Sequence, residues 1–169
     1  MRISAFIYLY ITAGLFALTG CGIYSHTGAS VPADAKTFSV SYIPNQASIV
    51  MPTLSQVLTE KLKTKFINET TLKLTQAEGD VQFSGKIIGS ATAPVGVQGN
   101  QQNAVNRLTV TIEITYVNTK DEKLNFSQQF VQFVNYPAEQ NFMSVEADLV
   151  RQVTDILVQD VFNKAFINW

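Results

Sequence analysis

Apolar and polar side chains alternate along four stretches of the chain, which is the pattern expected of strands that bury one face. The four stretches are residues 37–43, 80–91, 108–116 and 124–134. The alternation is clearest in the third stretch, where every second residue is large and apolar: Leu108, Val110, Ile112, Ile114 and Tyr116. The pattern therefore predicts a sheet in which these stretches are the strands.

More detailed predictions concern the first and the fourth strand and the segments between strands. In the first strand, the side chains expected to face inward are Phe38, Val40 and Tyr42. In the fourth strand the alternation slips near Gln128 and Gln129, and a β-bulge there would restore the register. Leu72 and Leu74 indicate a further, shorter strand, and residues 94–103 a polar loop rich in glycine, glutamine and asparagine.

Apolar side chains recur at helical spacing in two other stretches. The first runs from about Thr53 to Thr70, and its apolar stripe consists of Leu54, Val57, Leu58, Leu62 and Phe66. Thr53 and Gln56 match the capping box that begins many helices. The second runs from about Ser144 to Asn168, with a stripe of Leu149, Val150, Val153, Ile156, Leu157 and Val161. Each predicted helix thus has one face to bury.

The order of these elements predicts the fold class. Helices that each bury one stripe, and strands that each bury one face, fit an α+β two-layer sandwich. We therefore expect both helices on one face of a mixed four-stranded sheet, in the chain order β-α-β-β-β-α. The other face of the sheet would carry mostly uncharged polar side chains: Ser39, Ser41, Gln82, Ser84, Lys86, Thr109, Thr111, Glu113 and Thr115.

The N-terminal residues follow a different pattern. An apolar run from Ile3 to Leu18 follows Arg2, as in a signal peptide, and Leu18-Thr19-Gly20-Cys21 resembles the bacterial lipobox. That resemblance implies cleavage before Cys21, attachment of a diacylglycerol to its thiol, and acylation of the new amine, for example with palmitate. The alternatives are an uncleaved anchor, for which the run is marginal because a span needs about 20 apolar residues, and a buried thiol.

The lipobox divides the chain into three parts. We expect residues 1–20 to be a cleaved signal peptide, residues 21–35 a lipidated tether, and residues 36–169 a single sandwich domain. Gly22 stands where an aspartate would retain a lipoprotein in the inner membrane, and residues 22–33 contain no acidic side chain. These features favour the outer membrane, with the domain facing the periplasm.

Charge and composition exclude several classes of function. Removal of the signal peptide, which contains Arg2, leaves eleven basic side chains against thirteen acidic ones. Nucleic-acid binding requires a basic surplus, so it is not expected. The single histidine, His26, lies in the tether, where it has no nucleophile to activate. No His, Cys or carboxylate group has the spacing of a metal site, so the sequence predicts neither an enzyme nor a cofactor.

Three basic residues are candidates for binding an anionic ligand. Lys61 and Lys65 lie about one helical turn apart on one shoulder of the first apolar stripe. Arg107 stands where the polar loop meets the third strand, and a guanidinium can hold a phosphate through two hydrogen bonds. The alternatives are solvated lysines and, for Arg107, a salt bridge at the strand end.

Four segments together resemble one bacterial family. They are Cys21–Ser30, Pro52–Ser55, Asn106–Val110 and the ending Phe162-Asn163…Asn168-Trp169. Behind a lipobox, this combination looks like the LptE-type lipopolysaccharide-assembly lipoproteins of Bacteroidota. The resemblance implies a small α/β sandwich with a non-enzymatic role. Members of the family stabilise the LptD outer-membrane β-barrel and assist the passage of lipopolysaccharide, and some also bind lipopolysaccharide.

The resemblance therefore implies a lipid-anchored protein that associates with an LptD-like barrel, with lipopolysaccharide as a second partner. No binding residue is carried over from the family, so Arg107, Lys61 and Lys65 depend on their own chemistry. The alternative function is a periplasm-facing lipoprotein adaptor that binds another envelope protein.

Overall fold

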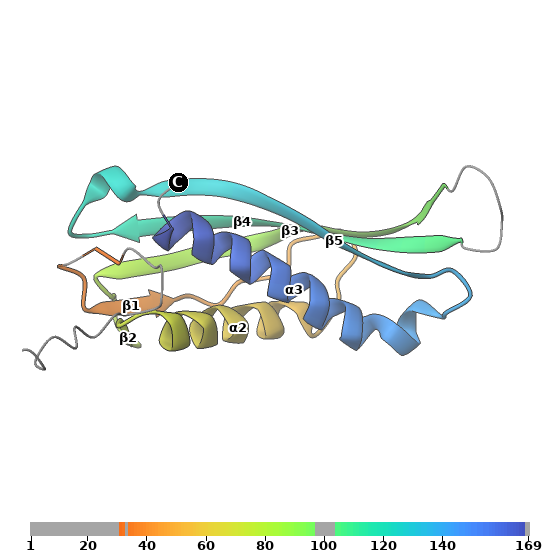
Figure 1. Cartoon of the computed structure of the whole chain (residues 1–169), viewed down its shortest axis with the longest axis horizontal. Helices are drawn as coiled ribbons and strands as arrows, with labels where there is room; N and C mark the ends of the chain where they lie inside the picture. The colour runs from red at the N-terminus through yellow and green to blue at the C-terminus, as the bar shows by residue number, and fades with distance from the viewer. Residues whose placement is uncertain (1–30, 33, 97–103, 168–169) are drawn as a thin grey trace, which may run out of the picture.

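The computed structural model describes residues 31–32, 34–96 and 104–167, which form two layers (Figure 1). One layer is a five-stranded sheet and the other consists of two long helices. The elements in chain order are β1 (Thr37–Val40), α2 (Leu54–Glu69), β2 (Lys73–Leu74), β3 (Val81–Val95), β4 (Val105–Asn118), the 3₁₀ turn η2 (Glu122–Leu124), β5 (Phe126–Pro137) and α3 (Phe142–Phe166).

The strands lie in the order β2-β1-β3-β4-β5. β1 is parallel to β2 and β3, whereas β3, β4 and β5 form an antiparallel meander. α2 and α3 lie on the same face of this sheet (Figure 1), so the predicted α+β two-layer sandwich is confirmed. The sheet has five strands rather than four because the short strand indicated by Leu72 and Leu74 joins it as β2, with Lys73 and Leu74 paired to Thr37 and Phe38.

Aromatic rings join the two layers. Phe66 of α2 is fully buried, and its ring centroid lies 5.6 Å from that of Phe38, 4.4 Å from Phe83 and 5.5 Å from Phe166. These separations are those of favourable aromatic pairs. Because Phe38 and Phe83 belong to the sheet and Phe166 to α3, this one side chain links α2 to the rest of the core.

β4 and the helical stripes follow the predicted patterns. The five inward residues of β4 are at most 1% exposed, while the residues between them are half-buried. The helical stripes are buried as well, apart from Val57, which is half-buried, and Ile156, which is 39% exposed. The local patterns predicted the buried residues of these elements because each element packs against the other layer along most of its length.

The prediction for the first strand is wrong at its end. β1 stops at Val40, and Tyr42 is 65% exposed instead of facing inward. After Val40 the chain stays beside β3, where Asn45 forms an isolated bridge with Ile87, but the fully buried residue is Ile43, whose N–H donates to Oγ1 of Thr59 at 3.2 Å. The inward position is thus shifted by one residue, so the alternation no longer applies.

The β-bulge predicted near residues 128–129 is also wrong. β5 pairs with β4 without a register shift, and the irregularity in the meander lies in β3, between Ile87 and Gly89. Alternation along β5 is continuous, and the apolar residues on its helix-facing side are Phe126, Phe130, Val134 and Tyr136. Val131 and Phe133 made the pattern look shifted because they are apolar residues on the opposite face.

The two helices begin differently from the prediction. Thr53 has helical backbone angles (φ −86°, ψ −17°) and makes no capping hydrogen bond through its side chain. A capping side chain acts from a residue in an extended conformation, so the predicted capping box with Gln56 does not form. α3 begins earlier than predicted, at Phe142, because Oδ1 of Asn141 accepts a hydrogen bond from the N–H of Met143 at 2.9 Å.

β3 continues to Val95, into the segment predicted to be a loop, and β4 begins at Val105, before the predicted start of its strand at Leu108. Pro94 of β3 pairs with Asn106 of β4. Proline is tolerated there because β1 pairs with β3 only as far as Phe83, so no described strand flanks β3 on its other side at Pro94. The rest of the predicted loop, residues 97–103, lies outside the described residues, as do Cys21 and the predicted signal peptide.

Candidate functional site

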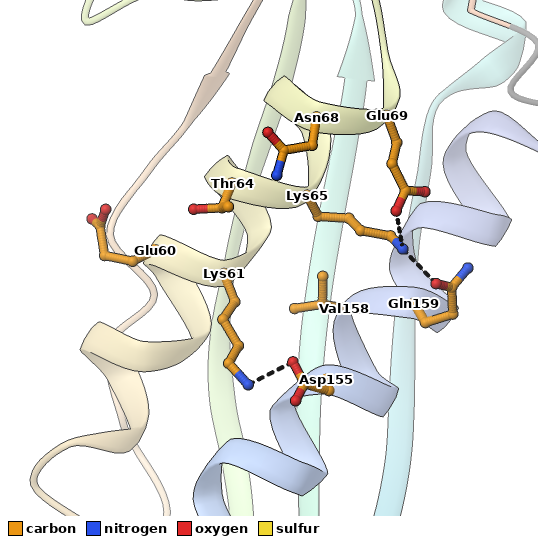
Figure 2. Close-up of a pocket in the computed structure, with 9 residues that line it drawn as sticks. All are labelled: Glu60, Lys61, Thr64, Lys65, Asn68, Glu69, Asp155, Val158 and Gln159. Atoms are coloured by element: carbon orange, nitrogen blue, oxygen red, sulfur yellow. Dashed lines mark hydrogen bonds and ion pairs between the residues drawn. The ribbon is translucent and has the colours of Figure 1, made fainter. Parts of the chain in front are cut away.

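The first surface that holds predicted ligand residues is an open groove between α2 and α3. Its volume is about 420 Å³, and it is lined by Glu60, Lys61, Thr64, Lys65, Asn68, Glu69, Asp155, Val158 and Gln159. Lys61 and Lys65 extend from α2 toward Asp155 and Gln159 on α3 (Figure 2). The structure therefore brings together two of the three predicted basic residues.

Both lysines have carboxylate partners in this groove. Nζ of Lys61 lies 2.5 Å from Oδ1 of Asp155. Nζ of Lys65 lies 2.5 Å from Oε1 of Glu69 and 2.5 Å from Oε1 of Gln159 (Figure 2). The two ammonium groups thus connect the helices, and each positive charge is balanced within the groove.

The lysine side chains are also held by neutral groups. Nζ of Lys61 donates to the backbone carbonyl of Arg151 at 2.7 Å. Nζ of Lys65 lies 5.2 Å from the ring centroid of Phe162, within the range of a cation–π contact. Since both lysine side chains remain partly exposed, at 25% and 20%, their ion pairs are worth at most about 1 kcal/mol each. The groove therefore holds two weakly paired lysines together with three carboxylates, those of Glu60, Glu69 and Asp155.

Arg107 lies on the other side of the sheet from these lysines. On β4 it alternates with the inward-facing residues, so its side chain points away from the helices. Its guanidinium carbon lies 3.9 Å from the ring centroid of Phe133, and its Nε donates to Oδ1 of Asn135 at 2.9 Å. These partners are neutral, unlike the partner of a strand-end salt bridge. The three basic residues thus divide between two faces of the molecule, and one compact ligand does not reach all of them.

We call the sheet surface opposite the helices the open face. The nine polar residues predicted for it are all half-buried or exposed. Lys86 and Glu113 form an ion pair across β3 and β4, with 3.2 Å between Nζ and Oε1. The hydroxyl oxygens of Thr115 and Ser127 lie 3.0 Å apart across β4 and β5. The open face is therefore a polar surface on which the lysine and the glutamate neutralise each other.

Two apolar residues of the open face were missed by the sequence analysis. Val131 and Phe133 on β5 are 55% and 45% exposed. Alternation carried through β5 from Phe126 without a bulge places both of them on this face. The apolar strip that they form is partly covered by the stacked guanidinium of Arg107.

Asp80 has a structural role where β1 and β3 begin. Its Oδ2 accepts hydrogen bonds from the N–H groups of Lys36 and Thr37 at 3.0 and 3.1 Å and from Oγ1 of Thr37 at 2.9 Å. Its Oδ1 lies 3.0 Å from Nζ of Lys120. The hydrogen bond from Lys36, followed by the contact with Lys120, holds the pKa of Asp80 far below its usual range. The carboxylate thereby connects the start of β1 to β3 and to the turn after β4.

The described part of the chain has neither a group of metal-ligating side chains nor a membrane-spanning helix. Within residues 31–32, 34–96 and 104–167, no three His, Cys, Asp or Glu side chains are grouped so that they could hold a metal ion. In the same ranges, neither helix has the length and apolar character needed to cross a membrane. The single histidine, His26, lies outside these ranges.

Solved bacterial structures share this fold. The hypothetical protein CT253 from Chlamydia trachomatis is similar with a TM-score of 0.52 and 7% identity, over 79% of this chain and 99% of that chain. Protein XCC0632 from Xanthomonas campestris is similar with a TM-score of 0.50 and 10% identity, over 79% and 87%. A minor lipoprotein from Acinetobacter baumannii has a TM-score of 0.48 and 16% identity, over 77% and 91%. At identities this low, the similarities to CT253 and XCC0632 show a common fold and nothing about activity.

The fold defines the class of protein as a two-layer α+β sandwich domain. The chain belongs to the LptE family, described as lipopolysaccharide-assembly, because the family model matches residues 35–165. The family resemblance seen in the sequence is thereby confirmed. A comparison with curated proteins finds no match. Family membership gives the chain a role in lipopolysaccharide assembly, as a member of a family of non-enzymatic assembly components.

Proposed function

We propose that this chain is an outer-membrane lipoprotein that associates with an LptD-type β-barrel and assists lipopolysaccharide transport to the outer membrane. In this proposal the domain faces the periplasm and performs no catalysis. The observation that carries it is the family match over residues 35–165, which covers nearly all of the sandwich. The alternative, an adaptor for another envelope protein, would use the same surfaces with a different partner.

The open face supports association with a barrel. The lumen of an outer-membrane barrel is lined by polar groups. The open face offers mostly hydroxyl and amide side chains, and Lys86 and Glu113 already neutralise each other. Such a surface can form hydrogen bonds with a polar wall without burying an unpaired charge, which would be costly. We therefore assign barrel contact to the open face rather than to the helices.

The lipid anchor is assigned to Cys21. Three acyl chains on an N-terminal cysteine exceed the two anchoring signals that stable membrane attachment needs. Replacement of Cys21 by alanine should abolish incorporation of labelled palmitate and release the protein from the membrane fraction. Retention of a Cys21→Ala variant in the outer membrane, without label, would show that another segment supplies the anchor.

The groove lysines and Arg107 are assigned to lipopolysaccharide, whose phosphate groups are the natural ligands for such cations. Lys61 and Lys65 form one site because they share the groove between the helices. Arg107 offers a separate contact from the open face. Of these two places we assign the larger contribution to the groove, since it contains two ammonium groups.

Affinity purification from detergent-solubilised outer membrane tests the proposal. The full-length protein should recover a large β-barrel in stoichiometric amount. A Thr111→Lys substitution, in the middle of the open face, should reduce this recovery several-fold. Gln56→Lys adds the same charge at an exposed position of α2 and is the matched control. Recovery of the lipoprotein alone contradicts barrel association, and recovery of a different envelope protein supports the adaptor alternative.

A further inference from the structure

A cavity of about 460 Å³ lies beside β1, near the edge of the sheet opposite β5 (Figure 1). Its lining comes mainly from the end of β1, the residues after β2 and the start of β3, and α2 contributes Lys63. The described lining shares no residue with the groove between the helices. Binding sites for small molecules have volumes of about 300–1,000 Å³, so this cavity is large enough to hold one.

The connection between β2 and β3, residues 75–80, forms one wall of this cavity, and we call it the crossing segment. Since β1 lies between β2 and β3 in the sheet, this segment has to cross β1. It crosses on the open face, where the N–H of Gly79 donates to Oγ of Ser39 at 3.3 Å. A Cβ atom at Gly79 would lie 2.7 Å from Cα of Phe38, so only glycine allows the segment to lie directly on β1. The segment therefore rises above the open face, with the cavity beside it.

Hydrogen bonds hold the crossing segment in place. Nε2 of Gln82 donates to the carbonyl oxygen of Gly79 at 3.2 Å. Within the segment, the N–H of Ala77 donates to Oγ1 of Thr75 at 3.2 Å. A site whose walls are already ordered loses less conformational entropy when a ligand binds. The cavity is therefore formed in advance of any ligand.

The cavity combines uncharged polar groups with one exposed aromatic ring. Ser41, Ser84 and Gln76 are exposed residues of its lining, and their hydroxyl and amide groups both donate and accept hydrogen bonds. Tyr42 lines the same cavity and is 65% exposed, so the apolar surface of its ring lies beside these polar groups. A sugar ring has the matching properties, because its hydroxyl groups lie around the rim and apolar C–H groups lie on its faces.

The charges of the lining favour a neutral ligand over an anionic one. Nζ of Lys63 lies 2.9 Å from Oε1 of Glu60, which balances the positive charge. Glu78 adds a carboxylate to the lining. A phosphate group would be repelled by this carboxylate, whereas a sugar can donate hydroxyl hydrogen bonds to it.

We propose that this cavity binds a neutral saccharide, with one sugar ring packed against Tyr42 and its hydroxyl groups hydrogen-bonded to the surrounding polar side chains. Two sources supply such rings in a bacterial envelope: the saccharide of lipopolysaccharide and the glycan of the cell wall. If the ring belongs to lipopolysaccharide, the inference rests on the proposed function and adds a sugar contact to the phosphate contacts. Saccharide binding is measured on the purified protein, so its failure is distinguishable from a failure to recover the barrel.

Calorimetric titration of the full-length protein tests for saccharide binding. The protein is kept in a zwitterionic detergent, because a glycoside detergent would itself present a sugar to the cavity. The two probes are a delipidated and dephosphorylated core oligosaccharide of lipopolysaccharide, and diacetylchitobiose for the cell-wall glycan. At least one should bind saturably with a Kd below about 1 mM, and the one that binds identifies the source. Inorganic phosphate should not compete. Binding of neither probe, or competition by phosphate, would overturn the proposal.

Substitutions of Tyr42 test where the saccharide binds. Tyr42→Ala should weaken binding about tenfold, because it removes the ring, whereas Tyr42→Phe keeps the ring and should change the Kd by less than about threefold. Met143→Ala is the matched control, since it removes a large side chain that is 83% exposed at the start of α3, outside the cavity. It should leave binding unchanged. Binding that survives Tyr42→Ala, or that falls equally with Met143→Ala, contradicts the assignment of this cavity.

Discussion

The two faces of the sheet differ in what the same strands present. Toward the helices, β3 and β4 supply fully buried apolar residues such as Ile87 and Ile112. Away from the helices, the same strands supply mostly threonine and serine side chains and one ion pair. These residues are half-buried or exposed. An antiparallel meander with one packed face and one polar face is a stable arrangement in water.

This difference separates stability from recognition. The helix-covered face contains the aromatic cluster around Phe66, and it is expected to supply most of the free energy of folding. The open face can change its contacts at little cost to the fold, so it is available to a partner. The following substitutions alter one of these two surfaces or the contacts that join the elements around them.

The largest effect is expected from truncation of the core cluster. Phe66→Ala removes a fully buried ring with close partners on the sheet and on α3, and should lower the free energy of unfolding by about 3–5 kcal/mol. Phe133→Ala on the open face, where the ring is 45% exposed, should cost less than about 1 kcal/mol. Urea unfolding measures both. Equal losses would contradict the division between the two faces.

A smaller effect is expected on ligand binding. The double variant Lys61→Ala/Lys65→Ala removes both cations of the groove and should weaken lipopolysaccharide binding about tenfold, or ~1.4 kcal/mol. Arg107→Ala should weaken it about two- to threefold, since it removes one charge-assisted contact from the other face. Titration of a fluorescent lipopolysaccharide measures these changes. Unchanged binding after all three substitutions would show that the basic residues are not the site.

Stability should depend on pH through the carboxylate of Asp80, which joins the start of β1 to Lys120. The pKa of Asp80 is depressed in the folded protein, so its contribution is fully present above the unfolded pKa, about 3.9. It is lost as pH falls from there toward the folded pKa. Asp80→Asn should therefore be less stable than the parent at pH 7, and the difference should shrink below about pH 4. A difference that stays constant from pH 7 to pH 3 would contradict this role.

The smallest effect is expected from the ion pair across the helices. Lys61 and Asp155 lie 2.5 Å apart, but their side chains are 25% and 69% exposed. A double-mutant cycle with alanine at both positions should give a coupling free energy below about 1 kcal/mol. A coupling of several kcal/mol would mean that the groove is needed for stability, and it would then be a poor place for ligand exchange.

Local alternation predicted the buried residues of strands that keep one face against the helices along their whole length. β4 is such a strand, and its inward residues were all identified. The pattern failed at Tyr42, because β1 ends at Val40 and Ile43 is buried instead, with its N–H donating to Thr59, a tertiary contact that has no local signal. It failed in β5 because Val131 and Phe133 are apolar on the open face, whereas an alternation rule assumes that apolar side chains face inward.

The candidate site was predicted in part. Lys61 and Lys65 were placed together by helical spacing, and the partner Glu69 is four residues from Lys65, a spacing that favours an ion pair. Asp155 was not identified, because its position depends on how α3 packs against α2. The separation of Arg107 from the lysines could have been predicted from the sequence. Arg107 is two residues from Thr109 on β4, so both side chains point to the same face, and Thr109 was already assigned to the open face.

Site-specific photo-crosslinking in living cells tests the central claim most directly. A photoreactive amino acid at Thr111 places the probe on the open face, and one at Gln56 places it on the helix layer. We predict that the probe at Thr111 forms a crosslink to an outer-membrane β-barrel and that the probe at Gln56 does not. A barrel crosslink from Gln56 alone, or from neither position, would contradict the assignment of the open face as the surface that contacts the barrel.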